Sequence, residues 1–137
     1  MTRPLPITPR CHLPLSVNKI IPTEIQGYDM EERQYTGRGI GLAVMDTGAF
    51  LHPDFRDRVV AFADMVRRRR DCYDDNGHGT HILGIAAGDG RLSGGRCAGM
   101  APGAHLIAVM VLDWRGNGSV NTVLAGVEYL LAKQKAL

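Results

Sequence analysis

The sequence predicts an α/β fold built on a parallel sheet. Three short apolar runs have the length and composition of strands, and two other segments have the features of helices. Strands and helices alternate along the chain, and this order favours a parallel sheet because a helix normally forms the crossover between parallel strands. The composition agrees, since 45% hydrophobic and 22% charged residues are typical of a globular protein and not of a disordered chain.

The first predicted strand follows an N-terminal arm. Residues 1–37 contain five of the seven prolines, so we expect an extended arm there and no regular structure. Residues 39–45 form an apolar run without alternation, which indicates a strand buried on both faces. Asp46 follows directly, so a carboxylate is expected at the carboxyl end of this strand.

The second predicted strand, residues 59–63, leads through a polar loop to a helix at residues 78–87. The loop contains four consecutive arginines at 67–70, which we interpret as a solvated segment because acidic residues follow them directly. Residues 75–77 offer a side chain that can cap the helix. The helix is expected to be buried through its apolar residues Ile82, Ile85 and Ala86.

The third predicted strand, residues 106–112, comes after a glycine-rich loop at 88–99. From Ser119 to about Lys135, apolar residues recur with helical spacing and mark one face of a helix, with Ser119 as its expected N-cap. That face consists of Val120, Val123, Leu124, Val127, Leu130 and Leu131.

Composition also excludes several classes of protein. The longest apolar run, residues 106–112, is far shorter than the roughly 20 residues that span a membrane, so no membrane partner is expected. Prolines near the N-terminus interrupt any secretory signal, which predicts a cytoplasmic location. A net charge of +2 is too small to indicate a nucleic-acid partner. Cys11, Cys72 and Cys97 are odd in number and lack C-x-x-C spacing, so we expect free thiols and no zinc site.

Asp46 and His78 are the residues that carry the chemistry. One follows a buried strand and the other begins the next helix, so both can face one crevice at the carboxyl ends of the strands. A carboxylate beside an imidazole fixes the ring tautomer and stabilises the imidazolium, which is the orienting half of a Ser-His-Asp triad.

Five motifs, in order, resemble the N-terminal half of subtilisin-like serine proteases, and most closely the bacterial intracellular-type members. They are Val44-Met45-Asp46-Thr47-Gly48, His52-Pro53-Asp54-Phe55, Asn76-Gly77-His78-Gly79-Thr80-His81, Gly99-Met100-Ala101-Pro102-Gly103-Ala104, and Val111-Leu112-Asp113 followed by Gly116-Asn117-Gly118-Ser119.

The resemblance implies a parallel-sheet, subtilisin-like α/β fold in which residues 38–137 form the N-terminal part of the peptidase domain. It implies that Asp46 is the triad aspartate and His78 the general base. It also implies that Gly116, Asn117 and Gly118 bind a peptide or protein substrate as an added strand, where glycines leave the backbone open. Gly77 and Gly79 are expected to leave the imidazole accessible. No cofactor is required.

The chain also departs from the family. In subtilisin-like enzymes the oxyanion-hole asparagine and the nucleophilic serine come after the helix that is predicted here from Ser119. Of the three serines, Ser16 lies in the arm, Ser93 in a glycine loop and Ser119 at the helix cap, and none stands in a nucleophile motif. We therefore expect a truncated domain, the N-terminal half only, that is inactive without the missing C-terminal half.

Alternatives remain open on the sequence alone. Asp46-Thr47-Gly48 is also the active-site motif of retroviral-type aspartic proteases, which are all-β dimers. A truncated remnant that binds peptides without cleaving them is a second, non-enzymatic alternative.

A metal site is the third alternative, with His78, His81, Asp74 and Asp75 as possible ligands. We favour instead a buried, hydrogen-bonded His81 and no metal at these residues. The resemblance adds Asp54 as a candidate calcium ligand, so calcium is a possible cofactor.

Overall fold

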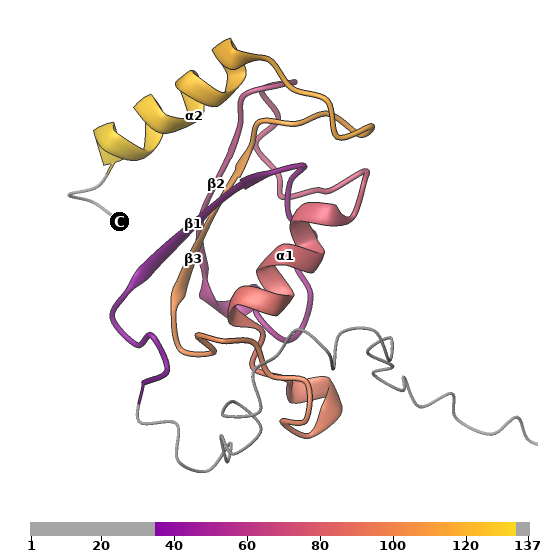
Figure 1. Ribbon diagram of the computed structural model, residues 1–137, viewed down its shortest axis with the longest axis vertical. Coiled ribbons are helices and arrows are strands. Elements are labelled where there is room, and N and C mark those ends of the chain that lie inside the picture. Colours follow the sequence, from indigo (N-terminus) through magenta and orange to yellow (C-terminus); the bar gives the residue numbers. More distant parts are fainter. Residues whose placement is uncertain (1–34, 134–137) are drawn as a thin grey trace, which may run out of the picture. The chain divides into compact units, whose positions relative to one another are not determined.

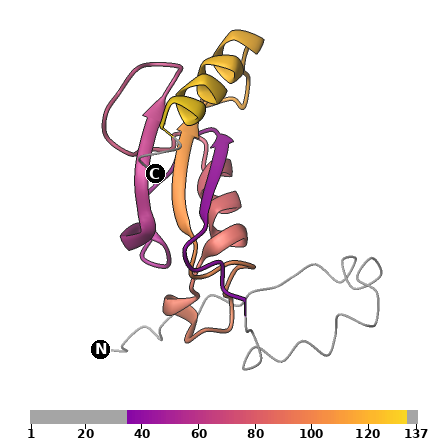
Figure 2. The ribbon, with the colours of Figure 1, turned by 90° about the vertical axis from the view of Figure 1, so that its left-hand side faces the viewer.

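The computed structural model describes residues 35–133, which form a three-stranded parallel sheet with helices on both faces (Figure 1). The strands are β1 (Gly41–Asp46), β2 (Val59–Asp64) and β3 (His105–Met110), in the order β1-β3-β2. In Figure 2 the orange β3 lies between the magenta β2 and the indigo β1. The predicted parallel α/β fold is therefore confirmed, and the predicted strands lie within two residues of the observed bounds.

The parallel register brings the carboxyl ends of the three strands together. Asp46 of β1 and Asp64 of β2 both stand opposite Met110 of β3. The last residues of all three strands, and the loops that follow them, therefore lie at one edge of the sheet. Functional residues in open parallel sheets collect at this edge.

Burial is uneven across the sheet. Leu106 to Met110 of the central β3 are all buried, as expected for a strand paired on both sides. The prediction that residues 39–45 are buried on both faces is wrong, because Gly41 and Ala43 are exposed and Ile40 is 62% exposed. The apolar run alone did not show that, among the described residues, β1 lies at the sheet edge.

Helix α1 (His78–Ala87) covers one face of the sheet. Its buried residues are Gly79, Leu83 and Ala87, which fall one helical turn apart. They pack in a core cluster with Phe55, Leu106 and Ala108, among others. The predicted helix is confirmed, but Ile85, which we expected to be buried, is 54% exposed. Figure 1 shows that the start of α1 lies beside the carboxyl end of β1.

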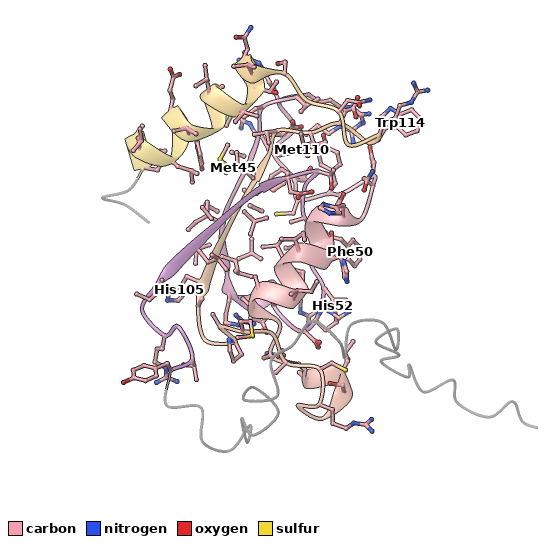
Figure 3. All side chains as sticks on the ribbon, in the orientation of Figure 1. Met45, Phe50, His52, His105, Met110 and Trp114 are labelled. Carbon is pink, nitrogen blue, oxygen red and sulfur yellow. The ribbon has the colours of Figure 1, made fainter. Side chains whose placement is uncertain are left out.

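Helix α2 (Val120–Lys133) covers the opposite face and packs through Gly126, Tyr129 and Leu130. Its N-cap is confirmed, because the Ser119 hydroxyl accepts from Thr122 N at 3.1 Å and Thr122 Oγ1 accepts from Ser119 N at 3.1 Å. Figure 3 shows Met45 on the side of the sheet that faces α2. Five of the six residues on the apolar face predicted from the sequence are exposed: Val120, Val123, Leu124, Val127 and Leu131.

The cysteine prediction is half correct for the described residues. Cys72 is free, as expected, but Cys97 is disulfide-bonded, which overturns the prediction of a free thiol there. Odd numbers and spacings of cysteines do not show which side chains the fold brings together. Cys11 and most of the predicted N-terminal arm lie outside the described residues. Among residues 35–133, no helix is long and apolar enough to cross a membrane.

Candidate active site

Asp46 and His78 meet at the carboxyl edge of the sheet. Asp46 is the last residue of β1 and His78 is the first residue of α1. His78 Nδ1 lies 2.8 Å from Asp46 Oδ1 and 2.9 Å from Oδ2. The contact expected from the sequence is therefore present, and it leaves Nδ1 as the donor to a carboxylate.

The two side chains differ in exposure. The Asp46 side chain is 12% exposed and the His78 side chain is 58% exposed. Asp46 Oδ1 also accepts from Thr47 N at 2.7 Å, which fixes the carboxylate relative to its own backbone. No residue in 35–133 forms a hydrogen bond with His78 Nε2. This arrangement orients the ring from its buried side and leaves the second nitrogen able to exchange a proton at the surface.

The start of α1 is held by side chains from outside the helix. The N-cap is Gly77, with φ of 94°, and it supplies no side chain. Instead, Asn76 Oδ1 accepts from His78 N at 3.1 Å, and the Asp74 carboxylate accepts from the backbone around it. Asn76 Nδ2 also donates to the Trp114 carbonyl at 2.9 Å, which ties this loop to the segment after β3.

Asp74 is a residue of the site whose role sequence reasoning missed. We weighed it only as a metal ligand, whereas its carboxylate accepts hydrogen bonds from N–H and O–H donors, as an anion does at a helix N-terminus. Burial raises the pKa of this carboxyl, but hydrogen bonds from Thr80, Gly77 and Thr47 outweigh burial and hold the pKa below its usual value. An aspartate just before a predicted helix was the signal that could have shown this.

Gly116, Asn117 and Gly118 lie in a tight hairpin after β3. Leu112 and Gly118 form an antiparallel bridge, and Asp113 N donates to the Asn117 carbonyl at 2.7 Å. Asn117 N and Gly116 N both donate to Asp113, so these two amides are already used within the hairpin. An incoming strand would have to pair with the remaining backbone groups of the segment.

Gly118 has a packing reason to be glycine. A Cβ there would lie 2.6 Å from Leu112 Cδ2 and 2.8 Å from the Val111 carbonyl oxygen. The hairpin closes this tightly only without a side chain at residue 118. The sequence interpretation, which explained the glycines by access for a substrate, missed this internal constraint.

The metal-binding alternatives gain no support from the geometry. Residues 35–133 contain no group of three or more His, Cys, Asp or Glu side chains that could hold a metal ion. His81 is exposed, so the prediction of a buried histidine is wrong, and Asp74 is already occupied by donors. Asp54 Oδ1 accepts from Leu92 N at 3.0 Å, and its role as a calcium ligand stays a prediction.

Comparison with known proteins identifies the family of this chain. Residues 37–136 match the model of the subtilase family. Serine protease AprX of Bacillus subtilis is 47% identical over 96 residues, which cover 70% of this chain and 22% of AprX. Subtilisin Savinase of Lederbergia lenta is 38% identical over 107 residues, which cover 78% of this chain and 38% of Savinase.

A solved structure supports the same assignment. The crystal structure of a cold adapted subtilisin-like serine proteinase superimposes with a TM-score of 0.62 at 33% identity, over 71% of this chain and 33% of that protein. The chain thus spans between about a fifth and two fifths of the length of these relatives. It has a subtilisin-like α/β fold and belongs to the subtilase family of serine proteases.

Proposed function

We propose that this chain supplies the aspartate and histidine of a subtilisin-type serine endopeptidase. Asp46 orients the imidazole and stabilises its protonated form, and His78 is the general base. The observation that carries the proposal is the contact of His78 Nδ1 with both carboxylate oxygens of Asp46, beside an Nε2 to which no described residue bonds. Membership of the subtilase family supports it.

The proposed reaction uses His78, a serine and one water molecule. His78 Nε2 takes the proton of a serine hydroxyl as its oxygen attacks the peptide carbonyl, and then gives that proton to the leaving amine. Water, activated by the same nitrogen, attacks the acyl-enzyme and releases the second product. The substrate is a peptide or protein that pairs along the Gly116–Asn117–Gly118 segment. No cofactor is required for this reaction, and calcium stays a possible cofactor. The cytoplasmic location stays a prediction.

The serine is proposed to come from a C-terminal half that these 137 residues do not include. Ser93 Oγ donates to the Gly90 carbonyl and accepts from Cys97 N, while Ser119 caps α2. Neither bonds His78, and Ser16 lies outside the described residues. The 137-residue chain alone is therefore proposed to be inactive, and incubation with a fluorophosphonate should leave it unlabelled. Labelling of one serine that depends on both Asp46 and His78 would contradict this.

The experiment that tests the catalytic roles is a chimera. Residues 37–136 of this chain replace the matching segment of Bacillus subtilis AprX, and hydrolysis of a peptide substrate is measured. We expect activity that falls by about 10⁴- to 10⁶-fold in Asp46→Ala and His78→Ala, the range measured for triad removal in subtilisin, a relative of this chain. The matched control is His81→Ala, an exposed histidine on the same helix, which should keep its activity.

Two other functions were considered from the sequence. The fold decides against one of them, and the chimera tests the other. A retroviral-type aspartic protease is all-β, and the parallel sheet with helices on both faces excludes that fold. The peptide-binding remnant predicts a folded chimera that binds peptides but does not cleave them. That result would contradict the proposed catalytic function.

A further inference from the structure

The Asp74 carboxylate is the acceptor for five hydrogen bonds next to the Asp46–His78 pair. Oδ1 accepts from Thr47 Oγ1 at 2.9 Å, from Asn76 N at 3.1 Å and from Gly77 N at 2.8 Å. Oδ2 accepts from Thr80 N at 2.9 Å and from Thr80 Oγ1 at 2.6 Å. Among residues 35–133, the His78 ring forms hydrogen bonds with Asp46 and none with Asp74, so any effect of Asp74 on the ring passes through its neighbours.

These hydrogen bonds fix the backbone on both sides of His78 and the residue that follows Asp46. Gly77 precedes His78 and Thr80 follows it by two residues, so one carboxylate fixes the backbone on either side of the histidine. Thr47 follows Asp46 directly, is fully buried, and accepts from Gly79 N at 2.9 Å through the same hydroxyl that donates to Asp74. The end of β1 and the start of α1 are thereby joined through side chains.

A neutral amide cannot replace this carboxylate. Both oxygens of Asp74 accept, and each faces at least one backbone N–H. Asparagine has one oxygen and one NH₂ group, so one set of donors would face another donor and would lose its partner. The negative charge also lies beside the N-terminal turn of α1, where the helix dipole favours an anion.

We propose that Asp74, acting through Thr47 and Thr80, is a positioning residue that holds the His78 ring against Asp46 in the Nδ1–H tautomer. This inference rests on the proposed function, because it assigns a task to Asp74 only if Asp46 and His78 work as a pair. A displacement of about 1 Å at a catalytic group can cost about 100-fold in rate, so a rigid link at this position matters for catalysis.

The test reads the His78 tautomer in the full 137-residue chain labelled with ¹⁵N-histidine. Ring ¹⁵N shifts are recorded at alkaline pH, where imidazoles are neutral, and the His78 signals are assigned by their absence in His78→Gln. The variants are Asp74→Asn and Thr47→Val, which break the link, and Asp46→Ala, which tests the pair itself. The controls are Asp75→Asn, an exposed neighbour that pairs with Arg67, and Thr47→Ser, which keeps the hydroxyl. Urea unfolding reports the stability of each variant.

We expect mainly Nδ1–H signals in the unsubstituted chain, Asp75→Asn and Thr47→Ser. Asp74→Asn and Thr47→Val should lose the dominant Nδ1–H signal and show a mixture of tautomers. If Asp74→Asn does not fold, the comparison of Thr47→Val with Thr47→Ser decides alone, because neither substitution changes the charge.

One result would overturn the positioning role of Asp74, and a different result would contradict the proposed function. If Asp74→Asn and Thr47→Val unfold at lower urea but keep the Nδ1–H signal, Asp74 is merely structural and the inference is wrong. If Asp46→Ala itself keeps the Nδ1–H signal, Asp46 does not orient His78, and the proposed function is contradicted instead.

Discussion

Gly79 is a residue at which the approach of α1 to β1 permits no side chain. A Cβ at this position would collide with the Gly48 carbonyl oxygen and would lie 3.0 Å from Gly48 N and 3.3 Å from Asp46 Cβ. All three atoms belong to the end of β1 or to the residues directly after it. None of them can move without moving the Asp46 carboxylate. The glycine therefore serves packing, whereas the sequence suggested only access to the imidazole.

The corresponding prediction concerns Gly79→Ala. Overpacking against backbone should lower the free energy of unfolding by about 1–3 kcal/mol, measured by urea denaturation. The matched control is Gly84→Ala in the same helix, where a Cβ meets nothing within 4 Å. That variant should gain up to about 1 kcal/mol, since alanine has the higher helix propensity. Equal effects of the two substitutions would contradict the packing argument.

The candidate site could be predicted from the sequence only in part. Asp46 and His78 were predictable, because a carboxylate after an apolar strand and a histidine at the start of the next helix both point to the carboxyl edge of a parallel sheet. The place of Asp74 at the start of α1 could have been predicted from an aspartate just before a predicted helix, but its contact with Thr47, 27 residues away, could not. The direction of a loop side chain depends on tertiary contacts that no local pattern encodes.

The loop after β2 is an element organised by one buried carboxylate. Asp64 is 7% exposed and accepts from Val66 N, Arg67 N, Arg69 N and the Tyr73 hydroxyl, at 2.7 to 3.0 Å. Burial raises the pKa of Asp64, but the hydrogen bonds outweigh it and leave the pKa below its ordinary value of 3.8. Burial and the bond to Asp64 raise the pKa of Tyr73 to about 12.

These shifts predict how stability depends on pH. The folded pKa of Asp64 is depressed, so its contribution is complete above pH 3.8 and is lost as the pH falls through the folded value. The folded pKa of Tyr73 is raised, so stability is complete below pH 10 and falls between pH 10 and about 12. Urea unfolding from pH 2 to pH 12 should therefore show losses at both ends.

Asp64→Asn tests the loop directly. An amide cannot accept from all four donors, so the variant should lose about 2 kcal/mol at pH 7 and should lose less than the unsubstituted chain on acidification. Ultraviolet titration should also show the Tyr73 pKa moving down from about 12. Asp71→Asn, at an exposed position in the same loop, should change stability by less than about 0.5 kcal/mol. A similar loss in both variants would argue against the role of Asp64.

Elements were easier to predict than their surroundings. The apolar runs and the Ser119 cap identified β1, β2, β3 and α2 correctly, because these signals are local. The burial of β1 was predicted wrongly, since a strand's place in the sheet is set by contacts distant in sequence. On α2 the apolar residues outnumber those that the sheet covers.

At the scale of the whole molecule, the outer side of α2 is the notable surface. Val120, Leu124, Val127 and Leu131 follow one another at helical spacing and are 75%, 54%, 39% and 64% exposed. An apolar stripe of this length is unusual on the surface of a soluble monomer and promotes association. Leu130, the neighbour of Leu131, instead packs against Ile107, Val109 and Val111 in the core on this side of the sheet.

Substitutions of the exposed and of the packed leucines of α2 should therefore have opposite effects on association and on stability. The double variant Leu124→Lys/Leu131→Lys removes exposed apolar surface, so it should reduce concentration-dependent association in sedimentation velocity and leave the urea midpoint nearly unchanged. Leu130→Lys places a charge against the core and should lower the free energy of unfolding by about 2 kcal/mol or more, without reducing association. If the double variant associated as the unsubstituted chain does, the stripe would not be the contact surface. If it lost as much stability as Leu130→Lys, the stripe would be covered by the fold itself.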